Sequence, residues 1–376
     1  MSTLDKTNSK AQSSRIPVWT RLLVGTLVTV AILLGLNAWI ESAGFLNNNS
    51  YQEGIIIDCG LAIILAVSLN LVNGFTGQFS LGHIGFYMIG AYLAAALATY
   101  GHYKFFSQLP VDHTFLPIST LHSALPILGI CLASGLAAAL AGFIVGLPSL
   151  RLKGDYLAII TVGFSQIILV VIRNIDAVKG KTSFIGINAP GDVFISTPHL
   201  TSFFWVYLCV AIVVWVSYSI RFSNHGLAFL TVRDDEVAAE AMGINTTRIK
   251  VLAFVLSAFF TGVAGALYAL YQTSLSNDAF TFQRGIDSVV MVVLGGLGSI
   301  SGVSIAAVLL TVVPEVLRAI EQYRLVVYPL LLIILMLARP QGIFGREELS
   351  WTWIKGQVMI VLRPIVRLLS RIRTRS

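Results

Sequence analysis

The sequence predicts an all-α, polytopic transmembrane helical bundle, and three observations lead to that prediction. The chain is 56% hydrophobic and only 11% charged, and its mean hydropathy is +0.82. Uncharged runs recur along most of its length, and a helix needs about 20 apolar residues to cross a hydrocarbon core. Glycine-rich segments interrupt two of these runs. A soluble protein with a large core would not contain so many long apolar runs with so little charge between them.

Ten apolar runs are candidates to cross the membrane. In chain order they are residues 22–40, 55–73, 86–100, 124–147, 155–172, 203–220, 251–270, 286–298, 301–317 and 325–338. The eighth run is too short to cross alone, and a re-entrant hairpin over 286–317 is an alternative. The predicted domains are therefore an N-terminal tail (1–21), a transmembrane domain (22–338) that contains a charged loop (221–250), and a C-terminal tail (339–376).

The basic residues predict the orientation of these spans. They precede the first span, occupy the loop at Arg151 and Lys153, recur in the charged loop and continue after Arg339. Cytoplasmic loops carry an excess of Lys and Arg, and ten spans place all four groups in the cytoplasm. Both termini are then cytoplasmic, although Arg318 and Arg324 fall outside in this scheme. The first span is expected to be a retained anchor, because it is longer than the core of a usual signal peptide.

Composition also excludes several partners and ligands. The net charge is +7, but the basic residues are scattered or lie at membrane edges, so no nucleic-acid partner is expected. The basic tail mixes Arg with aromatic and apolar residues, which is typical of a helix on an anionic lipid surface. Cys59, Cys131 and Cys209 lie singly in apolar runs and read as small core residues, so neither disulfides nor a metal site is predicted.

The charged loop contains a short predicted helix. Asp234 or Asp235 can cap it, Glu236 favours its N-terminal end, and Gly243 is a natural stop. About two helical turns are too short to be stable alone in water, so this helix needs a surface to lie on. It is suited to dock onto a soluble partner, through Glu236, Glu240, Ala241, Met242 and Gly243. An ordinary solvated loop is the alternative.

A glycine-rich break follows the second run, at residues 70–85. Bare backbone cannot face lipid, so this segment must be buried in protein or line a wet cavity. Broken helices of this kind form substrate paths in transporters, and a tight helix–helix turn is the structural alternative. The candidate path residues are Asn70, Asn73, Gly74, Gly77, Gln78, Ser80, Gly82 and His83. A second glycine-rich interruption at 295–302 hints at an internal repeat.

The sequence lacks catalytic signatures. It has no Walker-type glycine loop with Lys, so the chain is not expected to bind ATP in the P-loop manner. No metal-ligand spacing or nucleophile elbow is visible either. Charges inside the runs are scarce, whereas ion-coupled carriers usually need intramembrane ionisable groups. The pattern predicts a permease that is not itself an enzyme and whose energy comes from a partner protein.

Five segments, in this order, resemble a known family. They are residues 68–83 (SLNLVNGFTGQFSLGH), 233–244 (RDDEVAAEAMGI), 264–268 (AGALY), 293–299 (VLGGLGS) and 339–344 (RPQGIF). Together they are similar to the LivM-type permeases of branched-chain amino acid ABC importers, and the resemblance covers most of 55–345. In that family the loop with Glu240 and Met242 corresponds to a coupling helix, which docks on the ATPase subunit.

The resemblance implies the partners. They are a LivH-like second permease, two ABC ATPase subunits that bind the ATP, and a periplasmic or lipid-anchored binding protein, in a bacterial inner membrane. Related permeases for urea, short amides or other neutral amino acids share the motifs, so these substrates are an alternative. An ion-coupled secondary carrier is a second alternative, and a membrane scaffold is a third. The charged loop favours the ABC permease, because the other two readings give it no role.

Overall fold

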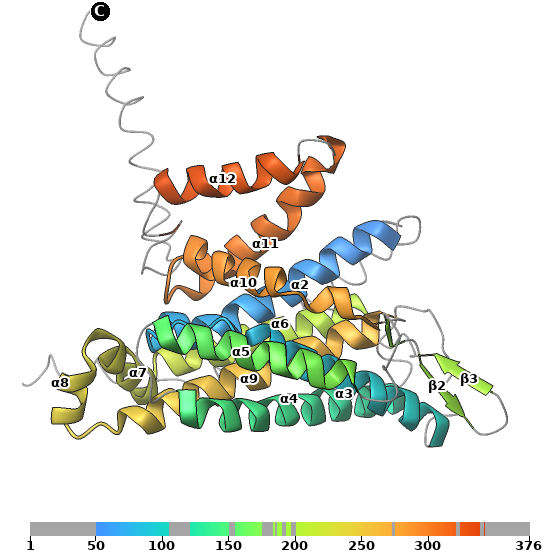
Figure 1. Ribbon diagram of the computed structural model, residues 1–376, viewed down its shortest axis with the longest axis horizontal. Helices are drawn as coiled ribbons and strands as arrows, with labels where there is room; N and C mark the ends of the chain where they lie inside the picture. The colour runs from blue at the N-terminus through green and yellow to red at the C-terminus, as the bar shows by residue number, and fades with distance from the viewer. Residues whose placement is uncertain are drawn as a thin grey trace, which may run out of the picture. The chain divides into compact units, whose positions relative to one another are not determined.

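The computed structural model describes residues 50–104, 121–149, 155–174, 183–184, 186–189, 193–196, 201–272, 275–320, 324–338 and 342 (Figure 1). The chain divides into two units, 1–50 and 51–376, and everything below concerns the second. The predicted first span (22–40), the N-terminal tail and nearly all of the C-terminal tail lie outside the described residues.

Helices make up most of the described chain. In chain order they are α2 (Ser50–Asn70), the π-helical turn η1 (Leu71–Phe75), α3 (His83–Lys104), α4 (Leu121–Ser149), α5 (Asp155–Arg173), α6 (Phe203–Arg221), α7 (Asn224–Asp234), α8 (Glu236–Ala241), α9 (Thr246–Tyr271), the 3₁₀ turn η2 (Asn277–Phe280), α10 (Phe282–Gly295), α11 (Ile300–Val316), the 3₁₀ turn η3 (Leu317–Ile320) and α12 (Arg324–Ala338).

Five helical segments among the described residues are long and apolar enough to cross a membrane. They are Tyr51–Phe75, Pro126–Pro148, Tyr156–Arg173, Phe203–Arg221 and Thr246–Tyr271, and His83–Thr99 and Ile300–Val316 are shorter apolar helices. The prediction of a helical membrane protein is confirmed at this level. Helix α10 has 14 residues, about 21 Å at 1.5 Å per residue, which is shorter than a hydrocarbon core of about 30 Å.

Two short antiparallel ribbons accompany the helices among the described residues. Strand β2 (Gly186–Ala189) pairs with β3 (Val193–Ser196) in the segment between α5 and α6. Strand β1 (Ser183–Phe184) pairs with β4 (Leu275–Ser276). Strand β3 contains Val193, Phe194 and Ile195, which are β-branched and aromatic residue types that favour strands. The sequence Pro-Gly-Asp at 190–192 lies between the two strands, and such a sequence is typical of a turn.

The core is built where α3, α4 and α9 pack against one another. Gly90 of α3 meets Gly262 of α9 so closely that a Cβ on Gly90 would lie 2.1 Å from the Gly262 carbonyl oxygen. Small residues allow such close approach between helices in membranes. Phe86 and Phe254 fill the space beside this contact, edge to face with ring centroids 5.6 Å apart. The three helices are therefore held at backbone contact.

Apolar side chains are exposed on the outer faces of α4 and α5. Leu136 and Leu140 on α4, and Ile159 on α5, are all more than 60% exposed. Soluble proteins commonly expose single apolar side chains but rarely expose continuous apolar helix faces. The outer faces of α4 and α5 are therefore suited to contact the lipid hydrocarbon. The three cysteines are free; Cys59 and Cys131 are buried core residues, as predicted, whereas Cys209 is partly exposed.

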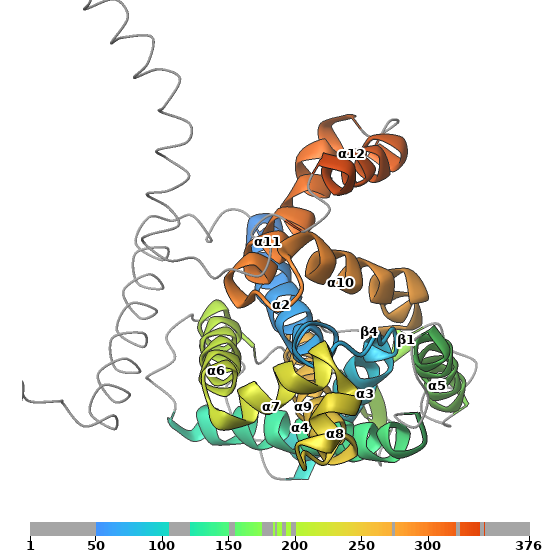
Figure 2. The same ribbon diagram turned by 90° about the vertical axis from the view of Figure 1, so that its left-hand side faces the viewer.

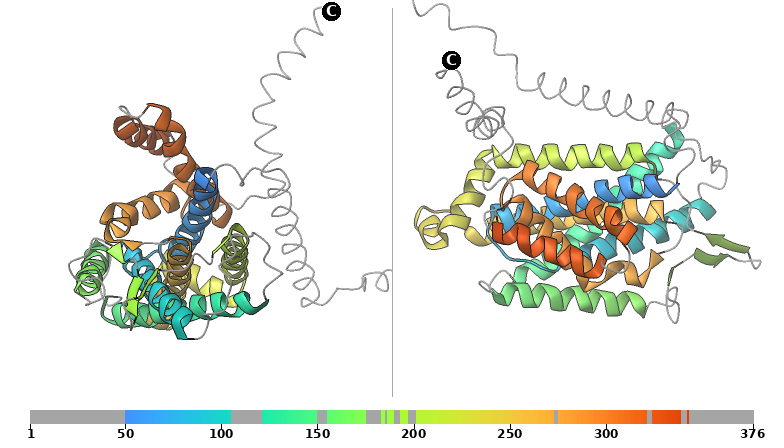
Figure 3. Two further views of the ribbon diagram at one scale, coloured as in Figure 1. Left: turned by 90° about the vertical axis from the view of Figure 1, so that its right-hand side faces the viewer. Right: turned by 90° about the horizontal axis from the view of Figure 1, so that it is seen from above.

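Different elements lie at the two ends of the long helices. Helices α7 and α8 lie at one end and the β2–β3 hairpin lies at the other, which Figure 1 and the right-hand view of Figure 3 both show. Seen from the α7–α8 end, α2 lies between the α3–α4–α9 core and helices α10 and α11 (Figure 2). We refer to the α7–α8 end as the coupling end.

Candidate functional site

The predicted break after α2 is present and well packed. The helix widens into the π turn η1, and the chain then runs without helix until α3 begins at His83. Asn73 closes this loop, because its Oδ1 accepts from the Ser80 nitrogen at 3.1 Å. Gly77 has a φ of +69°, a left-handed conformation that L side chains rarely adopt. The segment is therefore buried in protein as predicted, with only Gly77 and Phe79 exposed.

Asn70 joins the two glycine-rich interruptions. Its Oδ1 accepts from the Gly298 nitrogen at 2.9 Å, and its Nδ2 donates to the Ser299 carbonyl at 3.3 Å. Gly74 packs against the same strip, and a Cβ there would lie 2.6 Å from the Gly298 nitrogen. Two segments more than 200 residues apart are thus joined by hydrogen bonds to backbone N–H and C=O groups. Non-helical backbone at membrane depth requires such partners.

Two arginines from the coupling end hold this junction. Arg233, near the end of α7, donates from Nη1 to the Gly74 carbonyl at 2.5 Å. Arg221, the last residue of α6, donates from Nη1 to the Gly298 carbonyl at 2.6 Å. Hydrogen bonds from charged donors are roughly twice as strong as neutral ones. The break, the second glycine-rich segment and the charged loop therefore form one connected structure, the glycine junction (residues 70–83, 295–299, Arg221 and Arg233).

Three predicted path residues carry polar atoms without partners. These are both amide atoms of Gln78, the Ser80 hydroxyl and Nδ1 of His83, all buried and unpaired among the described residues. Buried polar groups are nearly always hydrogen-bonded, so unpaired ones mark a place for water, solute or a partner. Gly82 carries no such group and instead packs against the Thr161 carbonyl.

His83 also belongs to a polar chain that crosses the core. Its Nε2 lies 2.5 Å from Ser257 Oγ, and that hydroxyl donates in turn to the Ser68 carbonyl. Ser68 Oγ and Thr261 Oγ1 lie 3.0 Å apart. These bonds connect α2, α3 and α9 beside the glycine junction, so His83 has a structural partner on one ring nitrogen and an unpaired atom on the other.

The short helix predicted in the charged loop is confirmed as α8. Asp235 is its N-cap, and Oδ1 accepts from the nitrogens of Val237 and Ala238 at 2.9 and 3.1 Å. Gly243 follows the helix with a φ of +82°. Only Ala239 of this helix is buried. The prediction missed α7, an 11-residue helix capped by Ser223 that leads into α8.

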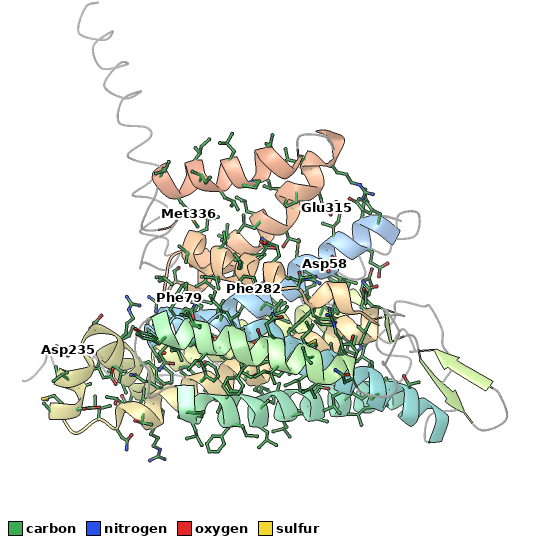
Figure 4. The ribbon with its side chains drawn as sticks, viewed as in Figure 1. Asp58, Phe79, Asp235, Phe282, Glu315 and Met336 are labelled. Carbon is green, nitrogen blue, oxygen red and sulfur yellow. The ribbon has the colours of Figure 1, made fainter. Side chains whose placement is uncertain are left out.

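Both acidic candidates on α8 point back to α9. Glu236 forms an ion pair with Lys250 at 2.6 Å, and Glu240 accepts from Thr246 Oγ1 at 2.7 Å. They fix the angle of α8 on the first turn of α9. Val237 and Met242 instead project outward, 72% and 81% exposed, and Ala241 is exposed beside them. The free face of α8 is therefore apolar, bounded by Asp235 at the tip of the coupling end (Figure 4).

The described residues hold no cluster of three or more His, Cys, Asp or Glu that could bind a metal ion. Arg221 and Arg233 are the functional candidates that sequence reasoning missed. Their charge was used only to orient the loop, and no local pattern reports that each reaches a carbonyl far away in the chain.

Comparison with known proteins agrees with this architecture. The family model of the branched-chain amino acid transport system permease component matches residues 51–338. LivM of Salmonella typhimurium, a high-affinity branched-chain amino acid transport system permease protein, is 34% identical over 306 residues, which cover 75% of this chain and 67% of LivM. The probable LivM of Methanocaldococcus jannaschii is 25% identical over 337 residues, 81% of this chain and 96% of that protein.

A second kind of relative is also similar. LivH of Salmonella typhimurium, another permease protein of the same transport system, is 36% identical over 133 residues, 35% of this chain and 43% of LivH. No solved structure matches the chain significantly. The family match extends over most of the chain and includes the glycine junction and α8, so this membrane protein belongs to the family of permease components of branched-chain amino acid transport systems.

Proposed function

We propose that the chain forms half of the translocation path of an ATP-driven importer for branched-chain amino acids. One observation carries the proposal. The exposed helix α8 is fixed to α9 by Glu236 and Glu240, and Arg233, just before it, bonds to the Gly74 carbonyl in the break. Movement of α8 can therefore reach the glycine junction through the Arg233 side chain.

In this proposal the chain has the partners of its relatives. A LivH-like permease supplies the other half of the path, and two ATPase subunits bind and hydrolyse ATP, so this chain binds no cofactor and is not an enzyme. A periplasmic or lipid-anchored protein delivers the solute. The apolar face of α8, with Val237, Ala241 and Met242, docks on an ATPase subunit, because so short a helix with an exposed apolar face fits a groove on a partner.

The proposal also includes the topology in the bacterial inner membrane. Ten spans over 22–338, counting short segments such as α10 and α11, put both termini and the coupling end in the cytoplasm. The tails 1–21 and 339–376 then lie on the same side as the ATPases, the second on the lipid surface. Urea, short amides or other neutral amino acids are the alternative solutes.

Met242 gives the cleanest test of docking, because it is 81% exposed and has no structural bond to lose. Met242→Arg should reduce leucine uptake per ATP hydrolysed on the order of tenfold, the loss expected for about 1.4 kcal/mol of interface energy. Glu240→Lys should do the same but also disturb the bond to Thr246. Uptake and ATP hydrolysis are measured together in proteoliposomes that contain the complete importer.

The matched control for Met242→Arg is Thr247→Arg, which adds the same charge to another exposed position of the coupling end. It should leave the ratio of uptake to hydrolysis unchanged. Normal coupling in Met242→Arg would remove α8 from the contact with the ATPase. An uptake that depends on a proton or sodium gradient and not on ATP would instead favour the ion-coupled carrier.

Cysteine labelling tests the path. Asn73, Gln78 and Ser80 are at most 6% exposed in this structure, so their access depends on the transport state. Cysteines at these positions should react with small water-soluble thiol reagents in at least one state of the complete importer, resting, nucleotide-bound or trapped during turnover. A cysteine at Ala95, which is fully buried in α3, should stay protected throughout. Protection of all three path positions in every state would move the path elsewhere.

A further inference from the structure

A guanidinium lies among aromatic rings at the side of the molecule away from α4. Arg284, in the first turn of α10, stacks over the ring of Tyr268 on α9 with its central carbon 5.2 Å from the ring centroid. The ring of Tyr87 on α3 is 6.0 Å away. Such stacking stabilises a desolvated cation. Nη1 also donates to the Ala279 carbonyl at 3.2 Å, so one edge of the group is bonded and its position is fixed.

A carboxylate of opposite charge lies on the neighbouring helix. Asp58 of α2 interacts electrostatically with Arg284, and Figure 4 labels it on α2, with Phe282 at the start of α10. The described residues nevertheless form no ion pair and no hydrogen bond between the two, and Asp58 bonds to none of them. Both side chains are partly exposed. Two opposite charges thus interact without forming an ion pair, and only the Arg284 guanidinium is held by a hydrogen bond.

These charges are at a depth where lipid cannot be their neighbour. Asp58 lies inside Tyr51–Phe75, a helix able to cross the membrane, about 10 Å from its first residue at 1.5 Å per residue. Arg284 packs on Tyr268, inside the spanning helix Thr246–Tyr271. Charged side chains in spanning segments face a bundle interior or a wet cavity, and they mark solute paths. The partly exposed side of α2 and α10 therefore faces water or a partner subunit.

The hydroxyl of Tyr87 lies beside Arg284 and forms no hydrogen bond among the described residues. It is completely buried, and it belongs to the ring under Arg284. A hydroxyl donor beside a guanidinium is suited to a carboxylate, and a carboxylate such as Asp58 is suited to an ammonium group. An α-amino acid carries both of these groups on one carbon. The sequence analysis did not single out Arg284, because one Arg near a run end has no distinctive pattern.

We propose that Arg284 and Asp58 form a transient binding site for an α-amino acid, in which the guanidinium receives the carboxylate and the Asp58 carboxylate receives the ammonium group. The site rests on the proposed import of amino acids and adds the place at which the charged ends of the solute are read. Urea and simple amides lack the two charges, so a site of this kind distinguishes amino acids from those alternatives.

Three ligands of the same size test the two charges separately. Leucine carries both charged groups, leucinol lacks the carboxylate, and 4-methylpentanoate lacks the ammonium group. Binding is measured by ligand-observed saturation-transfer NMR on the complete permease–ATPase complex in nanodiscs, without the binding protein. We expect leucine to bind best. Arg284→Gln should weaken leucine about tenfold, the order of a charge-assisted hydrogen bond, and leave leucinol unchanged. Asp58→Asn should weaken leucine and leave 4-methylpentanoate unchanged.

The control is Arg318→Gln, which removes a guanidinium that stacks on Tyr51 at 5.0 Å and not on Tyr268 or Tyr87. This variant should bind the three ligands in the same order of affinity as the wild type. Arg284→Lys keeps the positive charge and should retain the preference for leucine over leucinol. If Arg284→Gln does not assemble, this variant still tests whether a cation at position 284 binds the carboxylate. Equal weakening of all three ligands by Arg284→Gln, or no discrimination in the wild type, would overturn the site. Leucine uptake by the complete importer with its binding protein tests the proposed function separately, because that function can hold when this site fails.

Discussion

Replacing Arg233 by alanine is expected to separate ATP hydrolysis from transport. The substitution removes the bond from the coupling end to the Gly74 carbonyl, 159 residues away in the chain, and leaves that buried carbonyl without its charged donor. Bonds of this kind are worth about 1.5–3 kcal/mol, or roughly ten- to a hundredfold in an equilibrium. Uptake of leucine should fall by that factor, whereas ATP hydrolysis by the assembled importer should persist.

Arg248→Ala is the matched control for this prediction. Arg248 is an exposed arginine of the same end of the molecule, and its bond to Asn245 is made by the backbone nitrogen, which the substitution keeps. Arg233→Lys should recover part of the coupling, because an ammonium group can still donate to a carbonyl but lacks the reach of the guanidinium. Both rates are measured on the same proteoliposomes. If hydrolysis and uptake decline in parallel in Arg233→Ala, the residue supports assembly and not transmission.

The contact between α3 and α9 should be the position most sensitive to an added methyl group. Gly90→Ala puts a carbon 2.1 Å from the Gly262 carbonyl oxygen, so the two helices must separate. Overpacking typically costs about 1–3 kcal/mol, and a shift of several degrees in the melting temperature of the complex is expected. A thiol-reactive dye can follow the melting, because the free thiols of Cys59 and Cys131 are buried and the dye reaches them only when the core opens.

Gly163→Ala, in α5, is the control for Gly90→Ala, because an added Cβ there meets no atom within 4 Å. Alanine is the better helix former by about 1 kcal/mol, so this variant should melt at or above the wild-type temperature. A Gly90→Ala variant as stable as Gly163→Ala would mean that the core helices are not at backbone contact.

Local chemistry made the charged loop and the break predictable. A short carboxylate before an alanine-rich stretch caps a helix, so the sequence limited the cap to Asp234 or Asp235 and indicated the end at Gly243; the structure has Asp235 as the cap. Glycines and amides between apolar runs likewise indicated that 70–83 is buried. In each case the residues that decide the structure lie within a few positions of one another.

The rest depends on contacts that no short window contains. Asn70 bonds to Gly298 across 228 positions, and nothing near Asn70 identifies that partner. The pairing of β1 with β4 involves two residues from each strand, too few for a periodic pattern. Helix α7 was missed because its apolar run, residues 227–230, is short and follows the Asn-His-Gly sequence at 224–226, which is typical of a loop. Run length alone likewise does not give the number of spans, since α10 has 14 residues and is shorter than a hydrocarbon core.

Helix α9 acts as a lever between the two sites. Its first turn is fastened to α8 through Lys250, and near its other end Tyr268 lies beneath Arg284. With 26 residues it is about 39 Å long, so a tilt of about 5° displaces one end by roughly 3 Å relative to the other. That displacement exceeds the tolerance of a hydrogen bond or a stacked cation. In the proposed mechanism, a small tilt imposed at the α8 end of α9 would be enough to release or capture a charged solute beside Tyr268, while every helix stays intact.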